Sequence, residues 1–194
     1  MRTFYLNPAV YNRLYGIMQY KNALALRTSL ETGLRIDDVL SLRPSDLKGR
    51  TLSGVAQKTG KPFKKVISQD LANRLREIAS KRFFFEHRLD PKKHRTRQAV
   101  WKDLKKAVKI LQVQGNIAPH SARKTYAVEL FKDCGINKVQ KELQHDRVST
   151  TALYAFADML DGKKENRTDV LISDEQIEVL SEKIAKKVAQ LLQS

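Results

Sequence analysis

The stretch Pro119-His120-Ser121-Ala122-Arg123-Lys124 is the part of the sequence around which the expected fold is arranged. Proline is tolerated in the first turn of a helix, and the apolar residues of 126–131 continue at helical spacing. His120 and Arg123 are therefore three residues apart near a helix start, where this spacing puts side chains on one face. An imidazole and a guanidinium on one rigid base suit a small anion, and phosphate is the expected one.

Basic residues are concentrated in the middle of the chain. The 194 residues include 37 Lys and Arg against 21 Asp and Glu, for a net charge of +16. Half of this excess falls in residues 81–109, which hold eleven basic and three acidic side chains, a net +8. Such clustering indicates a polyanionic partner. Nucleic acid is favoured over a membrane, because no signal peptide, lipidation motif or run of about 18 apolar residues is present.

Cys134 is the single cysteine of the chain, so an internal disulfide is excluded. This favours a reducing compartment, and we expect the protein in the cytoplasm with the cell's DNA. Cys134 stands just before Gly135 at the end of an apolar segment. Because no paired motif surrounds it, it is interpreted as a small core residue rather than a reactive thiol.

The first part of the chain is predicted to form three helices. Asn7 precedes a proline and caps the first, and the second is expected to be capped by Asn22 and closed by Gly33. A short third helix runs over residues 34–42 and ends before a proline. Arg35 consequently lies at a glycine-marked corner between two helices. It either reaches inward to a ligand or is an ordinary surface arginine.

Residues 51–68 are predicted to form a β-hairpin with two lysines at its turn. Apolar residues flank the turn sequence Gln57-Lys58-Thr59-Gly60-Lys61-Pro62. A lysine on such a turn is normally just solvated. Alternatively, Lys58 projects into a groove and supplies a proton, since charged neighbours can make a lysine acidic enough to do so.

Two amphipathic helices are predicted over residues 69–85 and 98–114, joined by the basic connection 88–97. Phosphate contacts are expected from the hairpin turn, this connection and the second helix, namely Lys61, Arg95, Arg97, Lys102, Lys105 and Lys106. Contacts of this kind hold a protein on nucleic acid without reading its sequence. His87 and His94 have no cysteine nearby, so a zinc site is not expected.

Beyond the His120 helix, Gly135 is expected to turn the chain into a further helix that ends near Gln144. His145 follows, and a later helix over 151–157 contains Tyr154. A tyrosine among apolar neighbours is normally a core residue whose hydroxyl finds a partner. The local sequence alone does not overturn that interpretation.

The order and spacing of seven residues resemble those of the tyrosine recombinase, or phage integrase, family. They are Arg35, Asp38, Lys58, His120, Arg123, His145 and Tyr154. The segment TGLRIDDVLSL of residues 32–42 is similar to the first arginine box of the family, and LQHDRVSTTALY of residues 143–154 to its histidine-to-tyrosine box. Each motif alone is moderately specific for the family, but all of them together are strong evidence for the resemblance. It covers roughly residues 20–160.

The resemblance implies an α+β, mainly helical domain with a small antiparallel sheet that cuts and rejoins DNA without metal, nucleotide or other cofactor. Tyr154 would attack the scissile phosphate, giving a 3′-phosphotyrosyl bond and a free 5′-hydroxyl. Arg35 and Arg123 would hold the nonbridging oxygens, and Lys58 would protonate the leaving oxygen. The two histidines would complete the set: His120 would assist proton transfer, and His145 would donate to the phosphate.

Asp38 matches an acidic position of the family that braces the first arginine, which is a supporting role. Metal-dependent nuclease chemistry is disfavoured by the residues themselves. Asp37 and Asp38 are adjacent, hence about 100° apart around a helix, and no other acidic cluster completes a two-metal site.

Two features depart from the family pattern. Gln144 stands where the family usually has glycine before the histidine, and only about 20 residues precede the matching region. The separate DNA-clamping domain that usually comes first is therefore missing. We expect either a compact single-domain recombinase or the catalytic fragment of a longer integrase.

The expected organisation is a catalytic domain over residues 1–160, a polar linker over 161–172 and a C-terminal helix over 173–194. A capping box at Ser173 precedes the apolar stripe of that helix. The resemblance implies a homotetramer on DNA, with this helix exchanged between subunits, and a monomer is left open for the chain without DNA. Packing of the helix on its own domain is an equal alternative.

The sequence thus predicts a site-specific recombinase of double-stranded DNA that acts in integration, excision or inversion. One alternative is a catalytically inactive DNA-binding regulator on the same fold. Another is a basic packaging protein in which the ordered set arises by coincidence. The complete set of active residues counts against both alternatives.

Overall fold

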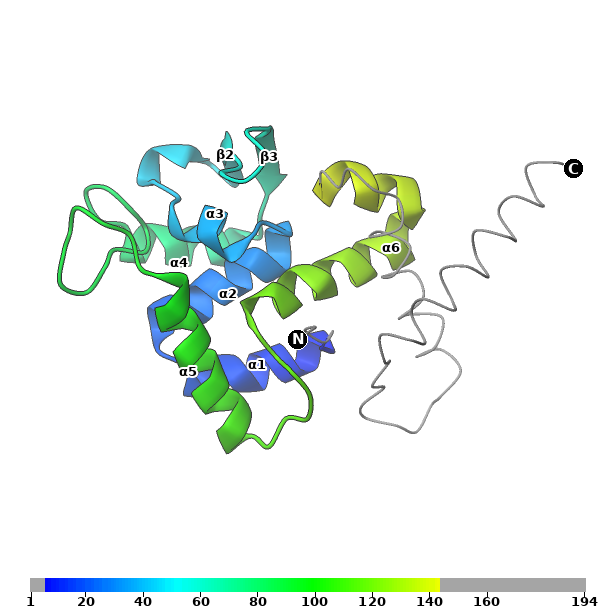
Figure 1. Cartoon of the computed structure of the whole chain (residues 1–194). Helices are drawn as coiled ribbons and strands as arrows, with labels where there is room; N and C mark the ends of the chain where they lie inside the picture. Colours follow the sequence, from blue (N-terminus) through cyan, green and yellow to red (C-terminus); the bar gives the residue numbers. More distant parts are fainter. Residues whose placement is uncertain (1–5, 144–194) are drawn as a thin grey trace, which may run out of the picture. The chain divides into compact units, whose positions relative to one another are not determined.

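The computed structural model describes residues 6–143 of the chain (Figure 1). The chain divides into two compact units, Met1–Tyr126 and Ala127–Ser194. The first unit contains every described element up to the start of the last helix, and the described part of the second unit is the remainder of that helix.

Helices make up most of the described chain. They are α1 (Pro8–Ile17), α2 (Tyr20–Thr32), α3 (Ile36–Leu40), α4 (Gln69–Ile78), α5 (Arg97–Ile110) and α6 (Pro119–Leu143), with a 3-10 turn η1 (Pro44–Asp46). A small antiparallel sheet has the order β1 (Leu47–Lys48), β2 (Thr51–Val55) and β3 (Pro62–Val66). The predicted α+β, mainly helical class is confirmed. None of the described helices is both long and apolar enough to cross a bilayer.

Polar side chains fix the starts of three helices. Asn7 accepts a hydrogen bond from the Ala9 N–H at 2.9 Å before α1. Before α4, the Ser68 hydroxyl accepts from the Leu71 N–H at 3.2 Å, and before α5 the Thr96 hydroxyl accepts from the Ala99 N–H at 3.2 Å. Each cap satisfies one of the backbone N–H groups that the first turn of a helix leaves without an intrahelical partner.

Asn22 does not cap α2, so that prediction is wrong. Gln19 is the N-cap residue, and Asn22 is only 2% exposed inside the helix. Its Nδ2 donates to Asp103 Oδ2 at 2.7 Å, and its Oδ1 accepts from Arg95 Nη1 at 2.7 Å. An asparagine with partners on neighbouring segments is held in the helix interior, where its local sequence resembles a cap.

Helix α4 is shorter than the predicted 69–85, and α5 is shorter than the predicted 98–114. Ala79 leaves α4 in an extended conformation. Phe84 and Phe85 then enter the core from an irregular segment, each at most 1% exposed. Phe84 and Phe85 therefore belong to the core without being helical, and the predicted extension of the helix to residue 85 is wrong.

Gly135 does not interrupt α6, contrary to the prediction, since the helix is continuous from Pro119 to Leu143. A glycine inside a helix costs only about 1 kcal/mol relative to alanine, which is too little to end a helix by itself. Cys134 is a free and exposed thiol. Its interpretation as a core residue is therefore wrong.

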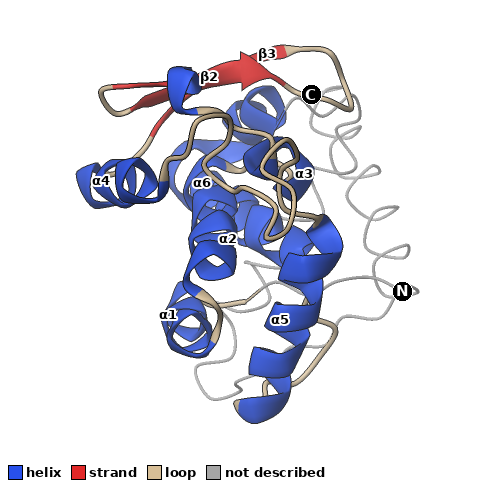
Figure 2. Cartoon of the chain, turned by 90° about the vertical axis from the view of Figure 1, so that its left-hand side faces the viewer, coloured by secondary structure: helices blue, strands red, loops and turns tan. Residues whose placement is uncertain are grey.

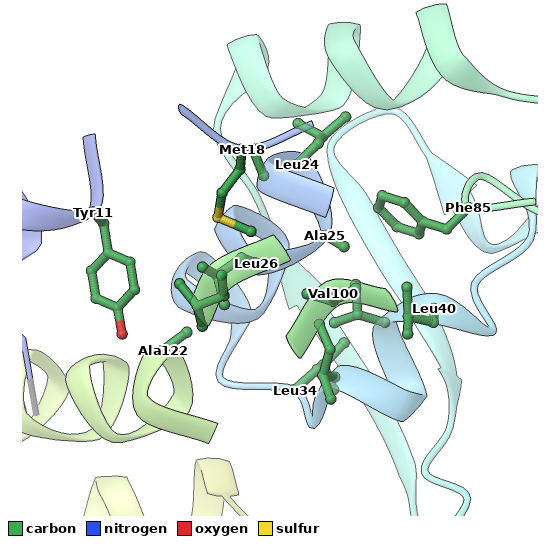
Figure 3. Close-up of a cluster of buried hydrophobic side chains, with 14 of the residues drawn as sticks. Tyr11, Met18, Leu24, Ala25, Leu26, Leu34, Leu40, Phe85, Val100 and Ala122 are labelled. Atoms are coloured by element: carbon green, nitrogen blue, oxygen red, sulfur yellow. The ribbon is translucent and has the colours of Figure 1, made fainter. Parts of the chain in front are cut away.

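Helix α2 is the centre of the first unit, because α1, α3, α4 and α5 all pack against it (Figure 2). In both views the sheet and α1 lie on opposite sides of α2 (Figures 1 and 2). The close-up of the core shows side chains from most of these elements in one cluster, including Leu26, Leu40, Phe85, Val100 and Ala122 (Figure 3). Full burial of each large apolar side chain contributes about 1.5–3 kcal/mol.

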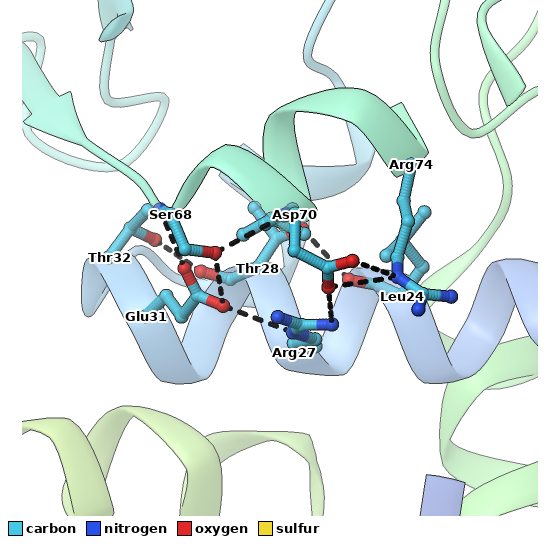
Figure 4. Close-up of polar contacts among 9 residues, drawn as sticks. Leu24, Arg27, Thr28, Glu31, Thr32, Ser68, Asp70 and Arg74 are labelled. Carbon is cyan, nitrogen blue, oxygen red and sulfur yellow. Dashed lines mark hydrogen bonds and ion pairs between the residues drawn. The ribbon is translucent and has the colours of Figure 1, made fainter. Parts of the chain in front are cut away.

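A polar network joins α2 to the segment that follows the sheet (Figure 4). Arg27 on α2 binds Glu31 at 3.0 Å and Asp70 at 2.6 Å, and Arg74 binds Asp70 at 2.9 Å. Glu31 accepts from the backbone N–H of Ser68 at 3.1 Å and from its hydroxyl at 3.2 Å. Because Ser68 follows β3 almost directly, the network holds the end of the hairpin against α2.

Candidate active site

The corner between α2 and α3 places Arg35. Gly33 ends α2 in the left-handed conformation, with φ of 69°, which glycine adopts without strain. Arg35 is the N-cap residue of α3 and is half-buried, and its carbonyl accepts from the Val39 N–H at 3.0 Å. Within residues 6–143 its guanidinium has no hydrogen-bond or ion-pair partner. The predicted role of Gly33 as the helix end is confirmed.

Arg123 reaches the same corner from α6. Its side chain is 4% exposed, and Nη1 donates to the Gly33 carbonyl at 2.6 Å. Gly33 is two residues from Arg35, so arginines from distant parts of the chain meet at one backbone turn. The hydrogen bond ties Arg123 to the backbone two residues before Arg35.

Asp38 connects this corner to the hairpin. Its side chain is 3% exposed, and Oδ1 accepts from the Gln57 N–H at 2.8 Å. The second oxygen, Oδ2, is buried and has no hydrogen-bond partner among the described residues. The contact that the structure gives Asp38 is therefore with the hairpin turn, and not with Arg35, the residue it was predicted to brace.

Lys58 follows Gln57 in the turn between β2 and β3 and is exposed. The turn is closed by the Ala56 N–H, which donates to the Lys61 carbonyl at 2.9 Å, and by the Gly60 N–H, which donates to the Ala56 carbonyl at 2.8 Å. Gly60 has φ of 65°, which again favours glycine. The predicted hairpin is confirmed, and its turn is attached to the arginine corner through Asp38.

His120 is exposed in the first turn of α6, whereas Arg123 is directed into the fold. Ser121, between them, helps start the helix: its N–H donates to the Ala118 carbonyl at 2.8 Å, and its hydroxyl accepts from the Ala118 N–H at 3.3 Å. The histidine and the arginine thus share one helical turn, but only the histidine faces solvent.

His145 and Tyr154 lie outside the described residues, as do the predicted linker 161–172 and C-terminal helix 173–194. The part of the site that the structure describes is the arginine corner, Asp38, the hairpin turn and the start of α6. Across residues 6–143, no group of three or more His, Cys, Asp or Glu is placed to hold a metal ion.

The profile of the phage integrase family matches residues 5–161. The chain belongs to this family. All six predicted catalytic residues fall within the matched range, and the predicted C-terminal helix falls beyond it.

Curated relatives of this integrase-family chain are bacterial tyrosine recombinases. Tyrosine recombinase XerC of Mesorhizobium japonicum is 31% identical over 148 residues, covering 71% of this chain and 47% of the relative. A tyrosine recombinase of Thermosipho africanus is 32% identical over 160 residues, covering 73% and 53%. The chain therefore spans about half the length of the curated relatives it matches.

Solved integrase structures have the same fold. A lambda integrase dimer bound to a COC′ core site matches with a TM-score of 0.68 at 17% identity, over 89% of this chain and 52% of that one. The catalytic domain of bacteriophage HP1 integrase matches with a TM-score of 0.62 at 20% identity, over 85% and 96%. The predicted tyrosine-recombinase catalytic fold is confirmed.

The predicted phosphate contacts differ in how open they are to a ligand. Arg95 is half-buried, and its Nη1 donates to Asn22 Oδ1 at 2.7 Å, while burial lowers the pKa of its guanidinium. Arg97 is exposed, with Nη1 3.4 Å from Asp37 Oδ2. Lys61, Lys102 and Lys106 are also exposed. Arg95 thus has a role inside the fold, and its predicted contact with DNA has the least support.

Lys105 also has contacts within the protein, since its Nζ donates to Asn116 Oδ1 at 2.9 Å and lies 5.9 Å from the Trp101 ring centroid. It can still offer charge to a polyanion from α5, beside Lys102 and Lys106. These contacts of an integrase-family domain with DNA remain predictions.

Two further residues near the site were not predicted. Lys65 is 8% exposed on β3, and its Nζ lies 5.6 Å from the ring centroid of Tyr126 on α6. Strand alternation could have found the lysine, because Lys65 pairs with buried Leu52 and its neighbours face outward. The contact with Tyr126 joins segments too distant in the sequence for a local pattern to show.

Proposed function

We propose that this chain is a site-specific DNA recombinase that cuts and rejoins double-stranded DNA through a 3′-phosphotyrosyl intermediate on Tyr154. One observation carries the proposal: Arg123 donates to the carbonyl of Gly33 at 2.6 Å, beside Arg35. Two arginines distant in sequence thereby share one corner, to which Asp38 attaches the turn of Lys58.

The arrangement of arginines suits a phosphodiester in its transition state. Negative charge grows on the nonbridging oxygens as the pentacoordinate phosphorus forms, and fixed cationic donors favour that state over the ground state. Arg123 is buried and tethered to a backbone carbonyl, so it needs little rearrangement when the charge develops. Arg35, half-buried two residues after Gly33, supplies the second set of donors.

The chemistry needs no external energy source. The phenol oxygen of Tyr154 forms a bond to phosphorus while the bond from phosphorus to the 5′-oxygen breaks, and the ammonium of Lys58 gives that oxygen a proton. The phenol, with an ordinary pKa of about 10, gives its proton to a base, the role assigned to His120, while His145 donates a hydrogen bond to the phosphate. Attack of a 5′-hydroxyl on the phosphotyrosine reverses the sequence and reseals the strand.

The proposed partner is duplex DNA, bound by several copies of the chain. The lambda integrase that shares this fold was solved as a dimer on a core site. A tetramer, with the helix of residues 173–194 exchanged between subunits, is the proposed recombining assembly.

A trapped adduct tests the proposal. The chain is incubated with a pool of nicked duplexes of random sequence, denatured in detergent, and the DNA strands that stay attached to protein are sequenced. We expect adducts that share a common sequence and are joined through the DNA 3′ end. Tyr154→Phe should abolish them, whereas Tyr20→Phe, at an exposed tyrosine that starts α2, should not.

Two results would count against a recombinase. One is the absence of any wild-type adduct although the chain binds duplex DNA, which would favour a DNA-binding regulator. The other is an adduct that persists in the Tyr154→Phe variant, which would assign the covalent bond to a different residue.

A further inference from the structure

Lys65 is a lysine on the inner face of the sheet. It is 8% exposed, whereas its neighbours Lys64 and Val66 are exposed, as expected for successive side chains of a strand. Its cross-strand partner, Leu52 of β2, is fully buried. Removing an ammonium group from water is unfavourable, so a lysine in this place requires compensating contacts.

The ring of Tyr126 provides one such contact. The Nζ atom of Lys65 lies 5.6 Å from the ring centroid, within the range in which the ring quadrupole attracts a cation. Tyr126 is half-buried on α6, three residues after Arg123. Side chains at this spacing are neighbours on a helix, so the contact joins β3 to the part of α6 that places the buried arginine.

Three contacts then link the three parts of the described site in a closed cycle. Arg123 joins α6 to the carbonyl of Gly33 at the corner, and Asp38 of α3 joins the corner to the hairpin turn at Gln57. Lys65 joins the hairpin back to α6. The Glu31–Ser68 hydrogen bonds hold the far end of the hairpin, after β3, and Asp38 holds its turn at Gln57. The contact between Lys65 and Tyr126 adds a direct link from β3 to α6, the helix that carries Arg123.

We propose that Lys65 and Tyr126 are positioning residues that set the placement of Lys58 relative to the phosphate held by the two arginines. The inference rests on the proposed function. As the bond from phosphorus to the 5′-oxygen breaks, its electron pair stays on the oxygen, and a proton moves to that oxygen from the Lys58 ammonium. Proton transfer depends steeply on distance, so a small displacement of the hairpin after the link to α6 is lost slows this step in particular.

A sulfur substitution in the DNA isolates that step. When sulfur replaces the bridging 5′-oxygen, the leaving group is a thiolate, whose conjugate acid has a pKa of about 8.5, and it departs without needing a proton. The probe is a duplex recovered from the random pool, made with oxygen or with sulfur at the mapped cleavage position. Adduct formation is measured in a single turnover at saturating protein.

Lys65→Met and Tyr126→Leu are expected to slow cleavage of the oxygen linkage by roughly tenfold to a hundredfold, and to cleave the sulfur linkage at nearly the wild-type rate. Tyr126→Phe keeps the ring and should stay close to the wild-type ratio of the two rates. Lys64→Met is the matched control, because it removes the same charge from the outer face of the same strand.

Equal slowing on both linkages would overturn the inference and assign the pair to folding or DNA binding. Wild-type rates in Lys65→Met on the oxygen linkage would overturn it as well. If Lys65→Met fails to fold in a thermal unfolding scan, Tyr126→Leu compared with Tyr126→Phe makes the same test. A wild-type chain that forms no adduct on either linkage would count against the proposed recombinase, and not against the pair.

Discussion

At the scale of single residues, Asp38 is the one whose contacts call most for a functional explanation. Its carboxylate is buried, with one oxygen bound to the Gln57 N–H and the other without a hydrogen-bond partner within residues 6–143. A buried polar atom without a partner costs about 1–3 kcal/mol. The other oxygen holds the backbone of Gln57, the residue before Lys58, against α3, and this contact gives the buried carboxylate a functional reason.

Two substitutions at Asp38 should therefore distinguish the effect of its hydrogen bond to the Gln57 N–H from the effect of its negative charge. Asp38→Ala removes the acceptor, and we expect single-turnover adduct formation to fall at least roughly tenfold, with a loss of about 1–3 kcal/mol in the free energy of urea unfolding. Asp38→Asn keeps an acceptor for the Gln57 N–H and should retain more of the cleavage rate. Equal rates for the two variants would show that the hydrogen bond to the turn does not matter.

At the scale of elements, the network between α2 and α4 holds the far end of the same hairpin. Hydrogen bonds from Arg74 and then Arg27 lower the pKa of Asp70 below its ordinary value of 3.8. A carboxylate whose pKa is lower in the folded protein stabilises the fold above pH 3.8, and that contribution is lost as the pH falls through the lowered value.

We therefore expect Asp70→Asn to lower the Tm at pH 7 by a small amount, roughly 1–3 °C, because the ion pairs are exposed. The difference in Tm from the wild-type chain should shrink as the pH falls below 3.8 and the wild-type carboxylate takes up a proton. Differential scanning calorimetry over this pH range provides the measurement. A difference that stays constant down to pH 2 would mean that Asp70 contributes through packing instead.

The elements that could be predicted from the sequence are those whose signals are local. The turn at Gly60 and the helix end at Gly33 both need a left-handed backbone, and a glycine in the sequence indicates such a position. The predicted cap by Asn22 and the predicted break at Gly135 are wrong. Partners on neighbouring segments hold Asn22 inside α2, and the small cost of one glycine does not end α6. The hydrogen bond between Asp38 and the turn joins residues far apart in sequence, so no local pattern could show it.

At the scale of the whole molecule, the basic excess of +16 can serve DNA binding only through side chains that are open to a polyanion. Lys102 and Lys106 are exposed on α5, whereas Arg95 is half-buried and bonded to Asn22. Each phosphate contact that is lost lowers the slope of log K against log salt by about one. The dependence of affinity on salt therefore separates cations that bind DNA from cations that hold the fold.

Lys102→Ala and Lys106→Ala together should lower that slope by about two, and leave the free energy of unfolding within about 0.5 kcal/mol of wild type. Arg95→Ala should do the reverse: the slope stays unchanged, while stability falls by about 1–2 kcal/mol because Asn22 Oδ1 loses the Arg95 hydrogen bond. Fluorescence anisotropy with a labelled duplex between about 50 and 200 mM salt, alongside urea unfolding, measures both quantities. A lower slope in stable Arg95→Ala would make this arginine a phosphate contact despite its place in the fold.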